Sequence, residues 1–571
     1  MGKLVQTWIQ RDPDPETRAE LQALLQDGRS AEIADRFHGR LEFGTAGLRG
    51  ILGAGPNRMN RLVVRETSAA LANYLREKIP NAAARGVVVG FDGRRGSTVF
   101  AEDAAVVFAA SGLCVHLFAH NVPTPVCAYA VCERQVAAGV VITASHNPPE
   151  YNGYKVYWEN GAQIIPPHDS GIAAAIEKAT KAPIPWQSLD EGRRSGRIQV
   201  LGEETIARYL QGVRGLSIHR PSARRAQYAI AYTPLHGVGA EVAERALKNA
   251  GFVRVHTVPD QREPDGNFPT VRFPNPEEPG AMDEVISLAR KVGAELACAN
   301  DPDADRLAVA ARDSQGSYQM LTGDQIGALL GADRIAAAPR RAVVATTIVS
   351  SRLLGEIARS AGLHFVETLT GFKWIMNGAL GAEAEGGETV FGYEEALGYS
   401  VGRLVRDKDG ISALVSFCEM AVAAADQGNT VFDLLEALYR KHGLYLTAQK
   451  SVPLSASRQG PSLGDRLRAT PPVQVGGHKV TCVTDMQKCE RLYADGRREM
   501  TTLPQSDVLI YLVEGDGRVI VRPSGTEPKV KCYYEVREQI GASETFAQAK
   551  ARAQAQLHAL MDAHQREISA V

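Results

Sequence analysis

A unit of strand, helix, glycine and strand recurs three times along the chain, and this recurrence constrains the fold more than any other feature of the sequence. The copies begin at residues 87–91, 228–232 and 342–347, each a short apolar run rich in β-branched or aromatic side chains. In each copy a polar loop leads into a helical stretch, which ends at a glycine before a second strand. The recurrence predicts three similar α/β domains.

Alternation of strands and helices predicts mixed, mostly parallel sheets, and in such sheets ligands bind beyond the carboxyl ends of the strands. A further strand follows in each copy, at residues 139–143, 295–299 and 388–391, and it runs into an unusual polar loop. Because these three loops fall at equivalent places, we expect them to carry the ligand-binding residues.

The length of 571 residues predicts about four domains at roughly 150 residues each. In the last hundred residues, the runs 508–513 and 518–521 flank Glu-Gly-Asp-Gly, a hairpin signal, and a strand at 529–536 precedes a long helix. This pattern predicts a smaller C-terminal α+β domain. The expected domains are 1–205, 206–325, 326–445 and 446–571.

The charge balance excludes several classes of partner. Lys and Arg total 64 against 65 Asp and Glu, so no basic field exists to hold nucleic acid or an anionic membrane. The longest apolar stretch, 104–119, is shorter than a membrane span, and the N-terminus lacks a signal-peptide core. We expect a cytoplasmic protein whose eight cysteines, without any Cys-x-x-Cys pair, are reduced core thiols. Nothing in the sequence indicates an oligomeric state.

The loop after the second-copy strand carries Asp301, Asp303 and Asp305. In an extended loop these alternating carboxylates would point to one side, where they repel one another unless a cation is bound. An all-oxygen site suits a hard ion such as Mg²⁺, whereas a solvated acidic turn is the alternative. An EF-hand is excluded because Arg306 and Arg312 stand at its glycine and glutamate positions.

Ser145 follows the first-copy strand and is succeeded by His146, Asn147 and two prolines. These neighbours predict a rigid exposed loop that presents the hydroxyl, although a simple turn is the alternative. The sequence contains no nucleophile elbow, no P-loop and no kinase catalytic loop, so hydrolase and nucleotide-driven mechanisms are unsupported.

Two segments combine small residues, hydroxyls and cations in the way that phosphate sites do. The first is 44–50, with Thr45 and Arg49, and the second is 522–529, with Arg522, Ser524, Gly525, Thr526 and Lys529. Together with a carboxylate metal site and a candidate nucleophile, they indicate phosphoryl transfer on a small phosphorylated substrate.

The motifs resemble those of the α-D-phosphohexomutase superfamily. Thr-Ala-Ser-His-Asn-Pro (143–148), Asp-x-Asp-x-Asp-Arg (301–306), Gly-x-Glu-Glu (392–395) and Arg-Pro-Ser-Gly-Thr-Glu-Pro (522–528) occur in that superfamily's order, and the resemblance spans residues 43–536. Residues 370–374 and 406–410 are similar to the branch of bacterial α-phosphoglucomutases and the phosphoglucomutase-2/phosphopentomutase enzymes.

The resemblance implies an active site in a central cleft and roles for these residues in it. Ser145 would carry a phosphoryl group, and Asp301, Asp303 and Asp305 would bind Mg²⁺ with one phosphoserine oxygen. His146, Lys155 and Lys408 are unranked candidates for proton transfer. The implied substrate ligands are Thr45, Arg49, Arg306, Lys373, Glu394, Glu395, Arg522, Ser524, Gly525, Thr526 and Lys529. A sugar 1,6-bisphosphate would be the activator and intermediate.

The sugar loop differs from that of many hexose-specific members of the superfamily. Those members have a serine after the two glutamates and a histidine at the end of the loop, whereas this chain has Ala396 and Tyr399. Interconversion of glucose 1-phosphate and glucose 6-phosphate is the first expectation. The alternatives are a phosphopentomutase, a phosphomannomutase or a sugar-bisphosphate synthase. A non-enzymatic sensor or scaffold protein is disfavoured, because the loops that carry the motifs are intact. For Glu394 and Glu395 the alternative to sugar binding is an acidic pair that stabilises a helix N-terminus.

Overall fold

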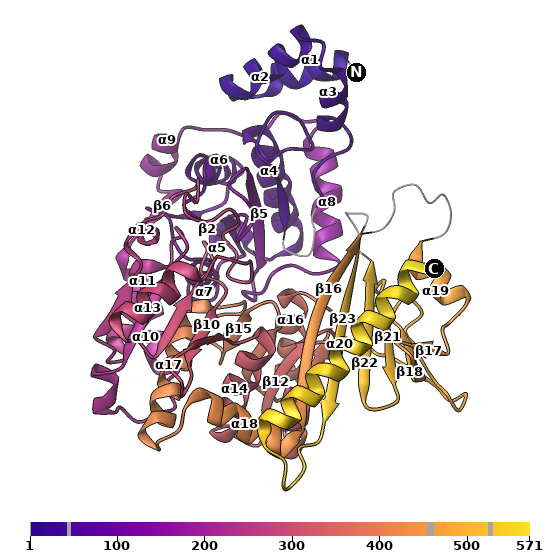
Figure 1. The fold of residues 1–571 in the computed structure, drawn as a ribbon. Helices are drawn as coiled ribbons and strands as arrows, with labels where there is room; N and C mark the ends of the chain where they lie inside the picture. Colours follow the sequence, from indigo (N-terminus) through magenta and orange to yellow (C-terminus); the bar gives the residue numbers. More distant parts are fainter. Residues whose placement is uncertain (1, 43–46, 454–461, 524–528, 571) are drawn as a thin grey trace.

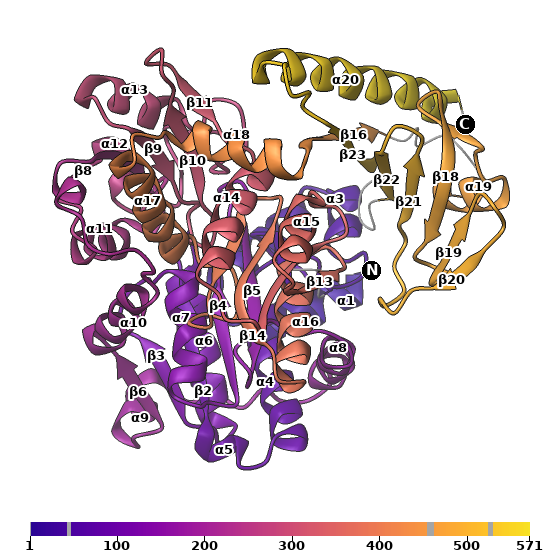
Figure 2. The same cartoon turned by 90° about the horizontal axis from the view of Figure 1, so that it is seen from below.

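The computed structural model describes residues 2–42, 47–453, 462–523 and 529–570. It confirms the predicted architecture of three α/β domains followed by a C-terminal domain with a large sheet and a long helix (Figure 1). The C-terminal sheet lies to one side of the three α/β domains in both ribbon views (Figure 2).

The first sheet is mixed, with the strand order β1-β5-β4-β2-β3-β6. Its strands are β1 (Leu48–Ile51), β2 (Val87–Phe91), β3 (Val115–Phe118), β4 (Ala138–Ile142), β5 (Tyr151–Trp158) and β6 (Ile198–Leu201). The helices around it are α4 (Arg61–Lys78), α5 (Ala82–Arg85), α6 (Ser97–Ala110), α7 (Thr124–Glu133), α8 (His168–Ala179), α9 (Leu189–Arg194) and α10 (Glu203–Gly215). Strands β2 and β4 are buried along their whole length, as expected for strands covered on both faces.

The second sheet has the order β11-β10-β9-β7-β8. It comprises β7 (Ala229–Thr233), β8 (Arg254–Thr257), β9 (Leu296–Ala299), β10 (Ala308–Arg312) and β11 (Tyr318–Met320), with the 3₁₀ turn η1 (Ala223–Ala226), α11 (Ala240–Asn249), α12 (Pro259–Arg262) and α13 (Asp283–Val292).

The third sheet has the order β13-β12-β14-β15. It comprises β12 (Ala342–Thr347), β13 (His364–Thr368), β14 (Glu388–Glu394) and β15 (Gly398–Val401), with α14 (Gly323–Ala336), α15 (Leu353–Ser360), α16 (Phe372–Ala384), α17 (Gly410–Asp426) and α18 (Val431–His442).

The three sheets share one arrangement. In each, the first strand of the recurring unit pairs in parallel with the second and third strands, and the third pairs antiparallel with the strand that follows it. The polar loops therefore leave the same end of equivalent strands, β4, β9 and β14. The loops that carry Ser145, the three aspartates and Glu394 thus occupy equivalent positions in the three domains.

The C-terminal sheet is antiparallel along the order β16-β23-β22-β21-β18-β19-β20, with β17 paired to β18. Its strands are β16 (Leu444–Pro453), β17 (Gln474–Val475), β18 (His478–Asp485), β19 (Glu490–Tyr493), β20 (Arg498–Met500), β21 (Leu509–Val513), β22 (Gly517–Pro523) and β23 (Lys529–Glu538), with helices α19 (Leu463–Ala469) and α20 (Phe546–Ala570). The predicted hairpin is present as β21 and β22, and α20 packs against β16 and β23 (Figure 2).

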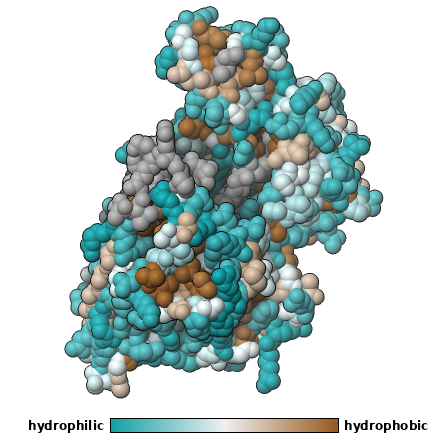
Figure 3. Space-filling view, turned by 90° about the vertical axis from the view of Figure 1, so that its right-hand side faces the viewer, coloured by the Kyte–Doolittle hydropathy of each residue, from teal (hydrophilic) through white to brown (hydrophobic). Residues whose placement is uncertain are grey.

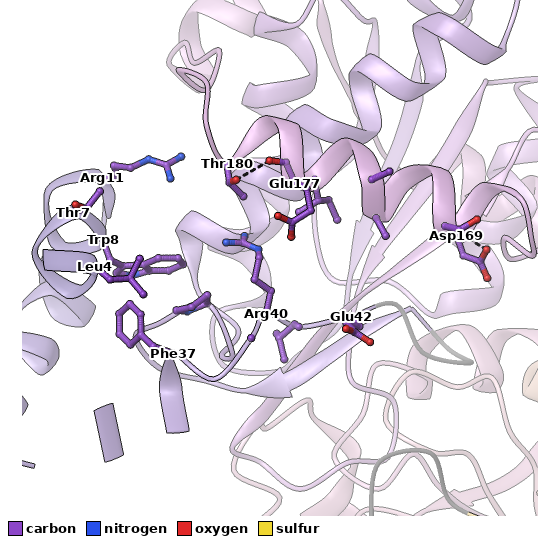
Figure 4. Close-up of a pocket in the computed structure, with 17 residues that line it drawn as sticks. Leu4, Thr7, Trp8, Arg11, Phe37, Arg40, Glu42, Asp169, Glu177 and Thr180 are labelled. Carbon is purple, nitrogen blue, oxygen red and sulfur yellow. Dashed lines mark hydrogen bonds between the residues drawn. The ribbon is translucent and has the colours of Figure 1, made fainter. Parts of the chain in front are cut away.

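Three helices precede the first sheet and were not anticipated as a separate unit: α1 (Gly2–Arg11), α2 (Pro15–Gln26) and α3 (Ser30–Arg36). They form a tier at the top of Figure 1, and Figure 3 shows apolar surface on this tier above a mostly hydrophilic face. A cavity of about 970 Å³ lies between α1, the segment 37–42 and α8, with Trp8, Phe37 and Arg40 at its wall (Figure 4). Arg11 and Arg40 both pair there with the buried Glu66.

Among the described residues, no helix combines the length and apolarity needed to cross a membrane. The cytoplasmic location stays a prediction. All eight cysteines are free thiols, as expected, but they are not all in the core, because Cys132 is exposed and Cys114 and Cys489 are half-buried.

Candidate active site

The loop after β4 holds Ser145 in a strained and buried conformation. Ser145 has a positive φ of 53°, and its backbone N–H donates to Thr143 Oγ1 at 2.8 Å. The side chain is only 2% exposed, so the prediction of an exposed loop is wrong. Burial follows because the aspartate loop of the second domain covers the hydroxyl.

Arg94 braces this serine loop from the loop after β2. Its guanidinium donates to the carbonyl oxygens of Ser145 at 2.6 Å, Pro148 at 2.9 Å and Tyr151 at 3.2 Å, and also to that of Asn147. One buried cation thus fixes the backbone on both sides of the hydroxyl. Sequence reasoning passed over Arg94, although it too follows the carboxyl end of a strand.

The loop after β9 gathers the three aspartates. Their carboxylate oxygens lie within 4.8 Å of one another, and all three side chains are fully buried. The predicted convergence is present, but the predicted cause is wrong, because the loop is a tight turn rather than an extended segment. Ala304 N–H donates to Asp301 O at 2.8 Å, and Ala304 has a φ of 58°. Full burial also excludes a solvated acidic turn.

Two lysines from different domains contact the aspartates. Lys155 Nζ, from β5, lies 2.7 Å from Asp303 Oδ2 and 2.8 Å from Asp305 Oδ2. Lys408 Nζ, from the loop after β15, lies 3.3 Å from Asp305 Oδ2. Burial alone would lower the pKa of each lysine, but the neighbouring carboxylates outweigh burial and raise it. Both ammonium groups therefore stay charged in this arrangement.

The aspartates keep two oxygens for a further ligand. Asp303 Oδ1 and Asp305 Oδ1 are buried and have no hydrogen-bond partner among the residues that the structure describes. An unpaired buried carboxylate oxygen is costly, and a hard divalent cation is the ligand that this oxygen-only set accommodates. The three aspartates thus fit a metal ion such as Mg²⁺.

Ser145 lies at the edge of the aspartate cluster. Its Oγ donates to Asp301 Oδ2 at 2.8 Å and lies 3.1 Å from His146 Nδ1. Burial first, and then Arg306 and Arg49, hold the pKa of His146 well below its usual range. The imidazole is therefore neutral near pH 7 and can accept a proton.

Two arginines line the same cavity as Ser145. Arg49, on β1, donates to Asn147 Oδ1 at 3.2 Å, and Arg306 contacts Glu277 Oε2 at 3.4 Å. Burial would lower the pKa of Arg306, but Glu277 and the aspartates raise it. Both guanidiniums line the cavity that contains Ser145.

The two glutamates of the sugar loop differ in their surroundings. They lie at the turn of the β14–β15 hairpin, not at a helix N-terminus, so the acidic-pair alternative is wrong. Glu395 Oε2 accepts a hydrogen bond from Ser350 Oγ at 2.9 Å, whereas Glu394 lies near Lys408 and Arg306. Tyr399 is fully buried and does not line the pocket, while Ala396 does.

These loops enclose a polar cavity of about 630 Å³. Of the predicted site residues, Arg49, Ser145, His146, Arg306, Lys373, Glu394, Glu395, Lys408 and Arg522 line it. Asp301, Asp303, Asp305 and Lys155 lie behind Ser145 in hydrogen-bonded contact. Thr45, Ser524, Gly525 and Thr526 lie outside the described residues, and of Lys529 only the backbone, in β23, is described.

Sequence reasoning missed other residues that line this cavity, namely Gln163, Asn275, Glu277, Glu278, Gln449, Ser451, Lys531 and Tyr533. Asn275 and both glutamates come from the long segment between α12 and α13, where the sequence analysis singled out no motif. The others come from strands β16 and β23 and from the segment after β5. The larger cavity beneath α1 contains neither the serine nor the aspartates, so the smaller cavity, which Ser145 lines, is the candidate active site.

The fold and site define a class of enzymes that move phosphoryl groups on sugars, and comparison with known proteins places the chain within it. It matches the phosphoglucomutase/phosphomannomutase family in alpha/beta/alpha domain I at residues 40–183, domain II at 207–316, domain III at 322–442 and the C-terminal domain at 486–551. The chain belongs to this family, within the α-D-phosphohexomutase superfamily. It is an isomerase that acts by phosphotransfer.

Three relatives are similar over almost their full length. A probable phosphoribomutase of Schizosaccharomyces pombe is 40% identical over 93% of this chain and 93% of its own. A probable phosphomannomutase of Haemophilus influenzae is 41% identical over 84% of this chain and 93% of its own. A phosphopentomutase of Mus musculus is 35% identical over 94% of this chain and 90% of its own.

Proposed function

We propose that the protein is a phosphosugar mutase in which Ser145 carries the transferred phosphoryl group. The observation that carries this proposal is the contact of Ser145 Oγ with Asp301, at 2.8 Å, at the wall of a polar cavity rich in cations. In the forward step the Oγ–P bond breaks and a sugar hydroxyl forms the new O–P bond, which yields a sugar bisphosphate. In the second step the other phosphoryl group returns to Ser145.

Asp301, Asp303, Asp305 and an oxygen on phosphorylated Ser145 would hold Mg²⁺, which when bound withdraws negative charge from the phosphoryl group. The two unpartnered carboxylate oxygens support this assignment. Arg306 and Lys408 add positive charge from the chain itself, where a transferring phosphoryl group needs it.

His146 is the proposed proton acceptor. It is the neutral member of the three candidates, whereas Lys155 and Lys408 are held protonated by the aspartates. Its ring nitrogen lies 3.1 Å from Ser145 Oγ, so His146 can take the serine proton when the phosphoryl group returns to Ser145 and can give it back when the Oγ–P bond breaks. The lysines then act as hydrogen-bond donors and fixed charges.

The opposite wall would bind the phosphate that is not reacting. Arg522 and Lys373 line that part of the cavity, and Thr45, Ser524, Gly525, Thr526 and Lys529 are assigned to the same task from their motifs. A bisphosphate intermediate requires such a second phosphate site, because the sugar must present each end to Ser145 in turn.

For the sugar, we propose a pentose phosphate as the preferred substrate. Ala396 lines the cavity without a hydroxyl, Tyr399 is buried in the core, and Oε2 of Glu395 is engaged by Ser350, so this loop offers few polar groups to the ring of a sugar. A pentose has fewer hydroxyls to satisfy than a hexose. The names of two of the relatives also support a pentose. Glucose phosphate is the second candidate, because Glu394 retains a carboxylate for ring hydroxyls.

The test compares kcat/KM on ribose 1-phosphate, deoxyribose 1-phosphate, glucose 1-phosphate and mannose 1-phosphate, with Mg²⁺ and catalytic sugar bisphosphate. Ser145→Ala should abolish turnover of every substrate, while Ser416→Ala, at a buried serine on α17, should leave it intact. Turnover by the Ser145→Ala enzyme would refute the assignment. A higher kcat/KM on glucose 1-phosphate than on the pentose phosphates would make a hexose phosphate the preferred substrate.

A sugar-bisphosphate synthase is the competing function on the same site. It differs by using a high-energy acyl phosphate as donor, so the same assay with that donor and no bisphosphate distinguishes the two. Rapid bisphosphate formation with slow isomerisation would favour the synthase.

A further inference from the structure

A buried carboxylate next to Lys408 connects two domains. Asp407 is 1% exposed and lies in the loop between β15 and α17. Tyr157 Oη donates to its Oδ2 at 2.6 Å, and Gln163 Nε2 donates to the same oxygen at 2.7 Å. Both donors belong to the first domain, about 250 residues away in the chain. Neither contact arises from local secondary structure.

The other oxygen of Asp407 serves Lys408 itself. Lys408 N–H donates to Asp407 Oδ1 at 2.8 Å, and Lys408 Nζ lies 3.8 Å from that oxygen. The lysine stem then passes over Gly398 and brings Nζ to 3.3 Å from Asp305 Oδ2. The carboxylate thus fixes the backbone of Lys408 and lies beside its charge.

We propose that Tyr157 and Gln163 are positioning residues for Lys408, which they hold against the aspartate cluster through Asp407. This inference rests on the proposed function, in which Lys408 supplies charge to the transferring phosphoryl group. The link joins the first and third domains at the lysine and reaches the second through Asp305. Lys408 is therefore in place only when the three α/β domains are correctly docked.

The direction of the hydrogen bonds is fixed by chemistry. Burial, reinforced by the charge of Asp407, holds the pKa of Tyr157 far above its usual value, so the phenol stays protonated and donates. Removing this hydroxyl leaves Asp407 Oδ2 with the single donor Gln163. The carboxylate can then rotate and release the lysine backbone.

The neighbouring residue provides a matched control. Asp409, on the other side of Lys408, accepts a hydrogen bond from the buried Tyr209 at 2.8 Å. Its same oxygen caps α17 by accepting from the N–H groups of Ile411 and Ser412. Tyr209→Phe therefore removes a tyrosine–aspartate bond of the same kind, at the same depth, without touching the carboxylate that holds Lys408.

The experiment measures kcat and KM, per folded enzyme, for Tyr157→Phe, Tyr209→Phe, Lys408→Ala and the double variant Tyr157→Phe/Lys408→Ala. We expect Tyr157→Phe to lower kcat by about ten- to a hundredfold, because small displacements of a charged group at the reacting atoms are costly. Tyr209→Phe should lower the melting temperature only. In the Lys408→Ala background, Tyr157→Phe should cause no further loss, because a residue that acts through another has no separate effect.

Equal kcat for Tyr157→Phe and Tyr209→Phe would overturn the inference, as would additive losses in the double variant. If Tyr157→Phe does not fold, Gln163→Met removes the second donor, and the same comparison with Lys408→Ala decides the question. Absence of turnover by the wild-type enzyme on every phosphosugar would instead refute the proposed function.

Discussion

At the scale of single residues, the site contains two buried carboxyl groups whose pKa values differ because their charged neighbours differ. Burial, together with Glu394 and Asp324, raises the pKa of Glu395 to about 7. Asp305 lies among cations, and although its burial acts in the opposite sense, Lys155 and Lys408 lower its pKa. Of two buried carboxyl groups, Glu395 therefore carries a proton near neutral pH, whereas Asp305 keeps its negative charge.

The raised pKa of Glu395 predicts a pH-dependent stability. The folded protein binds this proton up to about pH 7, whereas the unfolded chain releases it near the ordinary value of 4.5, so this group's contribution falls as pH rises through that window. Glu395→Gln, which can still accept from Ser350, should melt higher relative to the wild type at about pH 8 than at about pH 5. Melting temperatures at the two pH values measure the difference.

Glu263→Gln is the control, because Glu263 is exposed and should give parallel curves. Parallel curves for Glu395→Gln as well would show that Glu395 is ionised like an ordinary surface carboxylate.

At the scale of elements, the hairpin β14–β15 makes room for a lysine. A Cβ on Gly398 would lie 2.3 Å from Lys408 Cδ and 3.0 Å from Glu394 Cγ. The glycine is required here by the close passage of a buried side chain rather than by its backbone angles. Strand β15 thus contributes a gap rather than a functional group.

We expect Gly398→Ala to displace Lys408 and to lower kcat/KM by about tenfold or more. Gly381→Ala makes the same change on the exposed face of α16, where nothing lies within 4 Å of the new Cβ. That control should keep its activity and gain about 0.5–1 kcal/mol of stability, because glycine is a poor helix residue. Full activity of Gly398→Ala would mean that the Lys408 side chain can reach Asp305 in another conformation.

The elements themselves were largely predictable, because the buried strands are short β-branched runs and their helices end at glycines. Because the strands could be recognised, the polar loops that follow them could be matched between the three copies. Ser145, the aspartates and Glu394 were therefore all predicted to belong to one site. The domain boundaries at 205, 325 and 445 stay predictions. Arg94, Tyr157 and Gln163 could not be found, because their partners lie some 50 to 250 residues away and no local pattern records such contacts.

At the scale of the whole molecule, a buried ionic cluster attaches the C-terminal sheet to the third domain. Glu535 on β23 lies 2.5 Å from Arg352 Nε and 3.5 Å from Arg518, and Arg518 donates to the carbonyl oxygens of Ile348 and Ser350. Burial would raise the pKa of Glu535, but the two arginines outweigh it and lower it. Ser350 also contacts Glu395, so this interface reaches the sugar loop directly.

Glu535→Gln should weaken the attachment of the C-terminal domain by about 1.5–3 kcal/mol, because the buried Arg518 loses the carboxylate beside it, whereas the half-buried Arg352 keeps Asp516. Calorimetry should then show an early transition for that domain. Glu388→Gln breaks a pair with Arg341, which is 71% exposed, and should leave the profile as it is in the wild type. Coincident profiles for all three proteins would contradict a structural role for Glu535.

The residues that line the candidate active-site cavity run from Arg49 to Tyr533 and come from all four domains. For the gene, this means that no partial product is useful. A stop codon or frameshift anywhere before the codon for Tyr533 removes part of the cavity, however much of the chain has already folded. Nor can one domain be expressed separately and keep a fraction of the turnover, so loss-of-function alleles should be spread along the reading frame instead of clustering at one motif.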